Sequence, residues 1–131
     1  AAYVMSKIKQ PTDPAAAPKQ GHEGAPDAWL VFEAGVLDGL DGIRAGDRVI
    51  VLTWLDRADR DTLVVHPRGD PDRPPQGVFS TRSQDRPNPI GLHRVQVLAI
   101  DDTRIHVRNL EALDRTPVVD IKPVLGPVDE R

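Results

Sequence analysis

The segment Ser80 to Val95, STRSQDRPNPIGLHRV, combines side chains and turns that suit the holding of a polar ligand. Arg82 and Arg86 carry planar, permanently charged donors that match carboxylate and phosphate groups. In RPNPIG, each proline fixes its own φ and pushes the preceding residue, Arg86 or Asn88, toward extended backbone. Because proline has no N–H, carbonyls and side chains must do the polar work of this loop, while Gly91 permits close approach by a backbone or a ligand. The pattern fits a preorganised pocket wall and, equally, a rigid corner whose arginines face water.

A second polar segment, NLEALDRTPVVDIKP, covers Asn109 to Pro123 and carries Glu111, Asp114 and Asp120. Acidic groups opposite arginines in a small protein would suit a ligand with both an ammonium and a carboxylate. They would equally form ordinary surface ion pairs, each contributing about 0–1 kcal/mol.

Common catalytic and cofactor motifs are missing from the sequence. The four histidines have no short metal-ligand spacing, and there is no cysteine and no HExxH. GxSxG, GxGxxG and GxxxxGK[ST] do not occur either. We therefore predict no metal site, and the sequence identifies no catalytic residue.

The composition predicts one globular domain, residues 1–131, with 39% hydrophobic residues. The lack of cysteine favours a cytoplasmic protein, and no apolar run approaches the ~20 residues of a membrane span. The net charge of −3 argues against a protein that coats nucleic acid. Residues 66–94 nevertheless carry five arginines against three aspartates, which leaves a local cationic region.

Short apolar runs separated by Gly, Pro and Asp predict an all-β fold, a single small antiparallel β-barrel with little helix. Residues 1–27 are expected to be largely loop, with a possible first strand at 3–8. The last extended segment contains Pro117 and Pro123 and is expected at an edge or corner. The other expected strands cover residues 28–36, 47–56, 61–66, 93–100 and 104–110, and a further strand is entered at GVFST (77–81). The strands at 93–100 and 104–110 are expected to form a hairpin.

Two segments, GVFSTRSQDRPNPIGLHRV and NLEALDRTPVVDIKPV, together resemble the TrmO/TsaA-like family of tRNA threonylcarbamoyladenosine N6-methyltransferases. That family shows GVFATR, then RPNPIGL, then L-D-x-x-D-G-T-P-V-x-D-I-K-P-Y after a hairpin. The element PKQG, Pro18 to Gly21, is similar to a further family motif, so the resemblance extends from Pro18 to Pro123.

The resemblance implies a β-barrel methyltransferase, usually a homodimer, that binds S-adenosylmethionine and methylates N6 of threonylcarbamoyladenosine beside the anticodon of threonine tRNA. It implies that arginines of the cationic region contact RNA phosphates, and Arg86 and Asn88 are the expected substrate contacts. Adenosylmethionine has an amino-acid end for Arg and carboxylate groups, a sulfonium that favours oxygens, and an adenine that can lie on Leu92. By motif, the cofactor contacts are expected at Pro18, Lys19, Gln20, Asp56, Arg57, Arg82, Leu92, Glu111, Ala112, Leu113 and Asp114.

The chain departs from the family pattern at several positions. GDR (Gly46 to Arg48) stands where members have F-S-H, Asp56 replaces a histidine, and Val124 replaces the closing tyrosine. Glu111 replaces the first aspartate of the acidic motif, and Arg115 replaces a glycine, so a turn with positive φ there would be strained or displaced. Two alternatives therefore stay open, which are methylation of a small metabolite and a non-catalytic barrel that binds adenosylmethionine or a protein partner.

Overall fold

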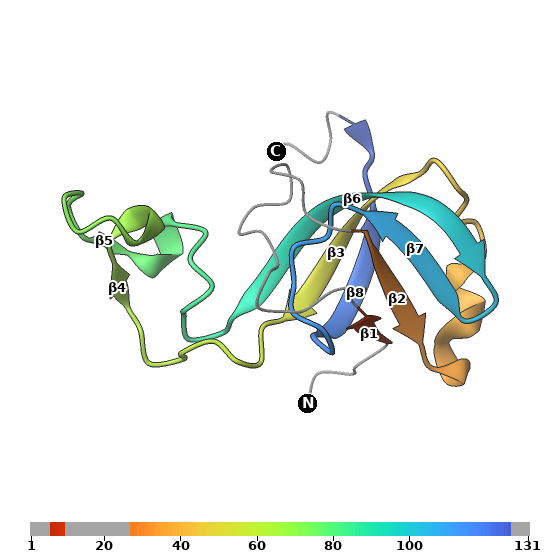
Figure 1. Ribbon diagram of the computed structural model, residues 1–131, viewed down its shortest axis with the longest axis horizontal. Coiled ribbons are helices and arrows are strands. Elements are labelled where there is room, and N and C mark those ends of the chain that lie inside the picture. Colours follow the sequence, from red (N-terminus) through yellow and green to blue (C-terminus); the bar gives the residue numbers. More distant parts are fainter. Residues whose placement is uncertain (1–5, 10–26, 127–131) are drawn as a thin grey trace.

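The computed structural model describes residues 6–9 and 27–126, and its architecture is antiparallel β (Figure 1). Six strands form the main sheet, and a separate pair, β4 and β5, forms a second small sheet. Regular helix in the described residues is limited to short 3₁₀ segments. The elements are β1 Ser6–Lys9, β2 Ala28–Phe32, η2 Ala34–Leu40, β3 Arg48–Trp54, β4 Val64–Val65, η3 Pro67–Gly69, β5 Gln76–Gly77, η4 Val78–Ser80, β6 Ile90–Asp101, β7 Arg104–Arg108 and β8 Pro117–Pro123.

The strands of the main sheet are hydrogen-bonded in the order β1-β2-β7-β6-β3-β8. All of these pairings are antiparallel, and β3 lies between β6 and β8. A short pairing, Ser6 with Val118 and Lys7 with Pro117, also joins β1 to β8. The expected antiparallel, mostly β fold is therefore confirmed.

The core follows from alternation along the strands, because successive side chains point to opposite faces. In β3, Val49, Val51 and Thr53 are buried while the residues between them are half-exposed. The apolar core consists of Ala28, Leu30, Phe32, Val49, Val51, Val95, Val97, Ile105, Val107, Leu110, Ala112 and Val118. At about 25 cal/mol per Å² of apolar area, burial of these side chains is the main force that holds the sheet together.

Several predicted elements differ from those observed. The strand expected at 28–36 ends at Phe32, and η2 replaces its last part. The strand expected at 61–66 shrinks to β4, and Val78–Ser80 is a 3₁₀ turn rather than part of a strand. The β6–β7 hairpin is confirmed, with partners from Gln96 with Arg108 to Asp101 with Arg104. Of the possible first strand at 3–8, the part from Ser6 is confirmed within β1, while residues 3–5 lie outside the described residues.

The expectation that the last extended segment, now β8, lies at an edge or corner holds only in part, because two of its residues also pair on the second side. This strand pairs with β3 on one side and with β1 on the other. Pro117 and Pro123 are its first and last residues, so the missing proline N–H groups fall at the two ends of the strand.

Residues 55–89, which we call the arm, leave the main sheet between β3 and β6 (Figure 1). The arm holds the β4–β5 sheet, η3 and η4, and Figure 1 shows it projecting away from the six strands. Its base is closed where the Leu55 N–H donates to the Pro89 carbonyl at 2.8 Å. The GVFSTR and RPNP motifs therefore lie in the arm, and its last residues lead directly into β6.

Candidate ligand-binding site

The GVFSTR turn is held from within the arm by Arg86. Its guanidinium is half-buried and donates to the carbonyl oxygens of Val78 and Thr81, the latter at 3.0 Å. The Val78 side chain is fully buried, and the backbone N–H of Val78 donates to the Leu63 carbonyl at 2.9 Å. Thr81 Oγ1 also donates to the Val78 carbonyl, at 2.9 Å. The side chain of Arg86, which we predicted to contact substrate, thus bonds to the backbone of its own loop.

The RPNP loop is held by a second arginine, Arg60. Its Nε donates to the Pro87 carbonyl at 2.7 Å and one terminal nitrogen donates to Asn88 Oδ1 at 3.2 Å. The same guanidinium lies over the Trp54 ring, 5.2 Å from its centroid, where a cation–π attraction adds to these bonds. Carbonyls and side chains thus do the polar work of the proline loop, as the sequence predicts. Arg60 itself was not predicted, since nothing in its local sequence marks it.

Gly91 is close to the side chains of Thr53, His93 and Leu55 rather than to a backbone. A Cβ at this position would lie 2.3 Å from Thr53 Oγ1 and 2.7 Å from His93 Nε2. Thr53 Oγ1 and His93 Nε2 are themselves hydrogen-bonded at 2.9 Å. Burial without a charged partner lowers the pKa of His93 from 6.5 to about 4. At neutral pH His93 is therefore uncharged, and the glycine of RPNPIG makes room for this pair of a buried threonine and a half-buried histidine.

The alternation of β6 separates this pair from the exposed face that carries Leu92. Residues 91, 93 and 95 of the strand share one face, and residues 90, 92 and 94 share the other. The side chain of Leu92 is 46% exposed, so an apolar surface is accessible at this predicted cofactor contact. Across the pairing, Leu92 is partnered by Leu52 of β3.

The acidic segment forms the connection between β7 and β8. Leu110 and Ala112 are buried in the core, and Glu111, Leu113 and Asp114 are half-buried beside them. Thr116 closes the turn, with its N–H and its hydroxyl donating to the Leu113 carbonyl at 3.2 and 2.7 Å.

Arg115 in this turn adopts φ of 69°, in the left-handed region that favours glycine. The turn therefore holds its arginine in a strained conformation, at the position where the family pattern has a glycine.

The remaining predicted contacts lie on different segments. Asp56 and Arg57 are exposed at the base of the arm, beside the Leu55–Pro89 hydrogen bond. Arg82 is exposed on the arm and makes no hydrogen bond or ion pair within the described part of the chain. Pro18, Lys19 and Gln20 lie outside the described residues.

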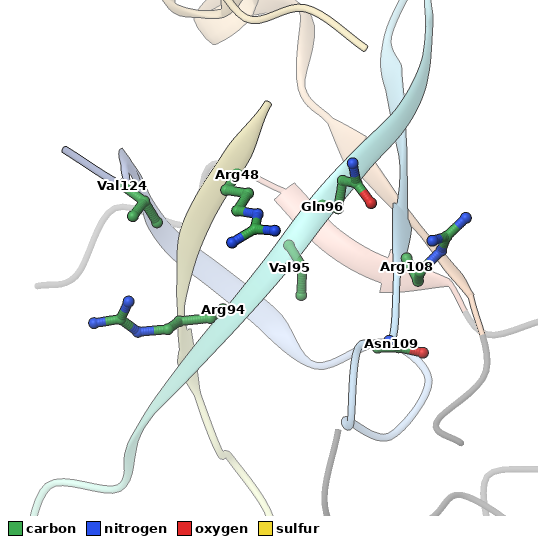
Figure 2. Close-up of a pocket in the computed structure, with 7 residues that line it drawn as sticks. All are labelled: Arg48, Arg94, Val95, Gln96, Arg108, Asn109 and Val124. Atoms are coloured by element: carbon green, nitrogen blue, oxygen red, sulfur yellow. The ribbon is translucent and has the colours of Figure 1, made fainter. Parts of the chain in front are cut away.

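A groove of about 370 Å³ was not predicted, and it lies over β6 and its neighbours β3 and β7 (Figure 2). We call it the arginine groove, and its lining residues are Arg48, Arg94, Val95, Gln96, Arg108, Asn109 and Val124. The sequence shows these as isolated residues, because their proximity depends on the pairing of β3, β6 and β7. Two of them, Arg48 and Val124, are departures from the family pattern.

Two further features concern membranes and metals. Within the described residues, 6–9 and 27–126, no helix is long and apolar enough to cross a membrane. Among the same described residues, no group of three or more His, Asp or Glu side chains is arranged to hold a metal ion.

The chain is similar to several known proteins along most of its length. It is 41% identical over 126 residues to an S-adenosyl-L-methionine-binding protein of Archaeoglobus fulgidus, covering 96% of this chain and 87% of that protein. A probable S-adenosyl-L-methionine-binding protein of Methanothermobacter thermautotrophicus is 40% identical over 126 residues, with 96% and 88% covered.

Solved structures show the same fold. The crystal structure of TrmO from Pseudomonas aeruginosa superposes with a TM-score of 0.77 at 25% sequence identity. The match covers all of this chain and 58% of that one, so this chain spans little more than half of the solved TrmO protein. Residues 6–130 match the family model of the tRNA-methyltransferase O N-terminal domain, and the chain therefore belongs to that family.

Proposed function

We propose that this protein is an S-adenosylmethionine-dependent methyltransferase whose acceptor is N6 of threonylcarbamoyladenosine, next to the anticodon in tRNA. The observation that carries the proposal is the family match over residues 6–130. The names of the relatives, as S-adenosyl-L-methionine-binding proteins, support the cofactor. The held arm loop and the exposed Leu92 side chain supply surfaces of the kind that such a ligand needs.

The residues present fit this cofactor by their chemistry. Exposed Leu92 offers an apolar surface for the adenine, and the half-buried carboxyl groups of Glu111 and Asp114 suit the ammonium and the sulfonium. Exposed Arg82 suits the carboxylate. When bound, adenosylmethionine would supply an electrophilic methyl group. Asp56, Arg57, Ala112 and Leu113, together with Pro18, Lys19 and Gln20, complete the proposed cofactor contacts.

The main task of the protein would be to hold acceptor and methyl group aligned and to exclude water. Arg60 and Arg86 would serve it by holding the proline loop in one conformation. Asn88, whose side-chain oxygen Oδ1 already accepts from Arg60, keeps its side-chain N–H groups for the substrate. We assign no proton acceptor.

The proposal extends to the assembly of the protein. The six strands would form a closed barrel with its seam at the short β1–β8 pairing, in a single domain of a cytoplasmic homodimer. Light scattering coupled to gel filtration tests the dimer directly.

The cofactor is tested by calorimetric titration with S-adenosylmethionine and S-adenosylhomocysteine. Saturable micromolar binding is expected. Arg82→Ala and Asp114→Ala should each weaken binding at least tenfold, which is about 1.4 kcal/mol. Arg73→Ala, an exposed arm arginine whose carboxylate partner Asp70 lies 3.8 Å away, is the matched control and should bind normally. Unchanged affinity in both folded site variants would refute this assignment of the cofactor pocket.

The acceptor is tested separately, with radiolabelled methyl transfer to threonine tRNA. Label should enter tRNA that carries threonylcarbamoyladenosine and should not enter the unmodified transcript. Cofactor binding without transfer to either RNA would contradict the tRNA assignment. It would favour a small-metabolite acceptor or a non-catalytic binding protein instead.

A further inference from the structure

The arginine groove concentrates positive charge on a protein that carries a net charge of −3. Arg48, Arg94 and Arg108 line it, and no acidic side chain is among its lining residues. None of the three forms an ion pair within the part of the chain that the structure describes. Three neighbouring guanidinium groups repel one another, and an anionic ligand would relieve that repulsion.

The nearby carboxylates are already engaged elsewhere. Asp47, which precedes Arg48, accepts a hydrogen bond from the Arg44 N–H at 2.9 Å. Asp120 of β8 lies 3.5 Å from Lys122 and accepts from the Ile121 N–H at 2.8 Å. Within the described part of the chain, neither carboxylate forms an ion pair with a groove arginine, so no paired carboxylate neutralises the three guanidinium groups.

The strand pairing explains how the arginines are spaced. Arg48 of β3 is opposite Gln96 of β6, and Gln96 is opposite Arg108 of β7. Neighbouring strands lie about 4.8 Å apart, so the Cα atoms of Arg48 and Arg108 are about 10 Å apart across the sheet. Arg94 lies two residues before Gln96, on the same face of β6. Figure 2 shows the three guanidinium groups spread over this face rather than directed at one point.

A spread of separate cations fits a chain of phosphates better than a single small anion, because successive phosphates can each contact one guanidinium group where it lies. We propose that the arginine groove binds the phosphodiester backbone of RNA, and this inference rests on the proposed tRNA substrate. The Gln96 and Asn109 amides, which have both donors and acceptors, suit the sugar hydroxyls and the phosphates of that backbone.

The position of the groove connects it to the proposed cofactor site. Arg94 is two residues from Leu92 on one strand face, and Asn109 directly precedes Leu110 and the acidic turn. RNA in the groove would therefore pass beside the proposed cofactor contacts. Arg48 and Val124 belong to the groove, so these two departures from the family pattern would shape RNA binding in this chain.

The test is fluorescence anisotropy with a labelled, unmodified threonine anticodon stem-loop RNA between about 50 and 200 mM KCl. Each lost phosphate contact on single-stranded RNA should lower the slope of log K against log salt by about 0.7. Over the tenfold range from 1 M to 0.1 M salt, a slope lower by about 0.7 means that the affinity at 0.1 M is about fivefold weaker for each lost contact. Loss of all three contacts weakens the affinity about 100-fold. We expect these losses in Arg48→Gln, Arg94→Gln, Arg108→Gln and the triple variant.

The control has the same charge change outside the groove. A second triple variant, Arg44→Gln with Arg104→Gln and Arg115→Gln, alters three arginines that lie outside the groove and outside residues 66–94, and it should lose less than threefold in RNA affinity. Equal losses in the two triple variants would attribute binding to net charge and overturn the proposal, as would full affinity in the groove variant. Circular dichroism and the urea midpoint verify that both are folded.

Two further measurements separate the groove from its alternatives. Adenosylmethionine affinity should change less than twofold in the groove variant, and a parallel loss of cofactor and RNA would instead make the groove part of the cofactor pocket. Inorganic phosphate that displaces the RNA at micromolar concentration would overturn the proposal in favour of a small-anion site. If the wild-type protein binds RNA through the groove but does not bind adenosylmethionine, the proposed function fails while the groove stands.

Discussion

Protonation of His93 should destabilise the fold in mild acid. The His93 ring nitrogen Nε2 is hydrogen-bonded to Thr53 Oγ1 at 2.9 Å, and burial lowers the pKa of His93 to about 4. In the unfolded chain the pKa returns to 6.5. Between these two values the unfolded state binds more protons, so the stability rises with pH and is lost as the pH falls.

The size of the effect follows from the two pKa values. Complete loss across a shift of 2.5, from 6.5 to about 4, corresponds to about 3 kcal/mol. The loss of unfolding free energy due to this histidine alone is RT ln[(1 + 10^1.5)/(1 + 10^−1)] at pH 5, which is about 2 kcal/mol. At pH 7 the same loss is about 0.2 kcal/mol. With a urea slope of about 2 kcal/mol/M, the unfolding midpoint should fall by about 1 M between these pH values.

The assay is urea unfolding followed by the fluorescence of Trp29 and Trp54. His93→Gln keeps an amide that can bond to Thr53 but cannot titrate, so the stability of this variant should fall about 2 kcal/mol less than wild type from pH 7 to pH 5. His66→Gln, on the exposed arm, is the matched control and should keep the wild-type pH dependence. The reasoning would be refuted if unfolding free energy fell equally from pH 7 to pH 5 in wild type and His93→Gln. It would also be refuted if NMR showed the His93 ring titrating near pH 6.5.

Two further predictions concern backbone positions. Gly91→Ala places a Cβ 2.3 Å from Thr53 Oγ1 and should cost about 1–3 kcal/mol of unfolding free energy in urea titrations. Combined with Thr53→Ala it should cost less than the sum of the single changes, and strict additivity would contradict the proposed clash. Arg115→Gly should stabilise by about 0.5–1 kcal/mol, because left-handed backbone costs arginine about 1–2 kcal/mol and glycine loses more entropy on folding. Arg73→Gly, where φ is not positive, should not stabilise; a destabilised Arg115→Gly would show that the turn is unstrained.

Much of the fold was predictable from local patterns. Alternation along 93–100 and 104–107 predicts two strands, and the intervening Asp-Asp-Thr predicts their turn; β6 and β7 confirm both. The errors have local causes too. Val78 and Phe79 have strand-forming side chains, but Ser80, Thr81 and Arg86 bond to carbonyls of this stretch and stabilise a 3₁₀ turn. In such short segments, contacts with neighbouring elements outweigh β propensity.

For the candidate site, the sequence by itself determined the RPNPIG and acidic motifs, and with them the family to which the chain belongs. Proline geometry and side-chain chemistry are local properties, so they can be read without coordinates. Tertiary structure alone decided which side chains meet. Arg60 reaches Pro87 from 27 positions earlier in the chain, and Thr53 meets His93 across 40. The arginine groove arises only once the register of β3, β6 and β7 is set, because strand pairing places residues distant in sequence about 5 Å apart on one face.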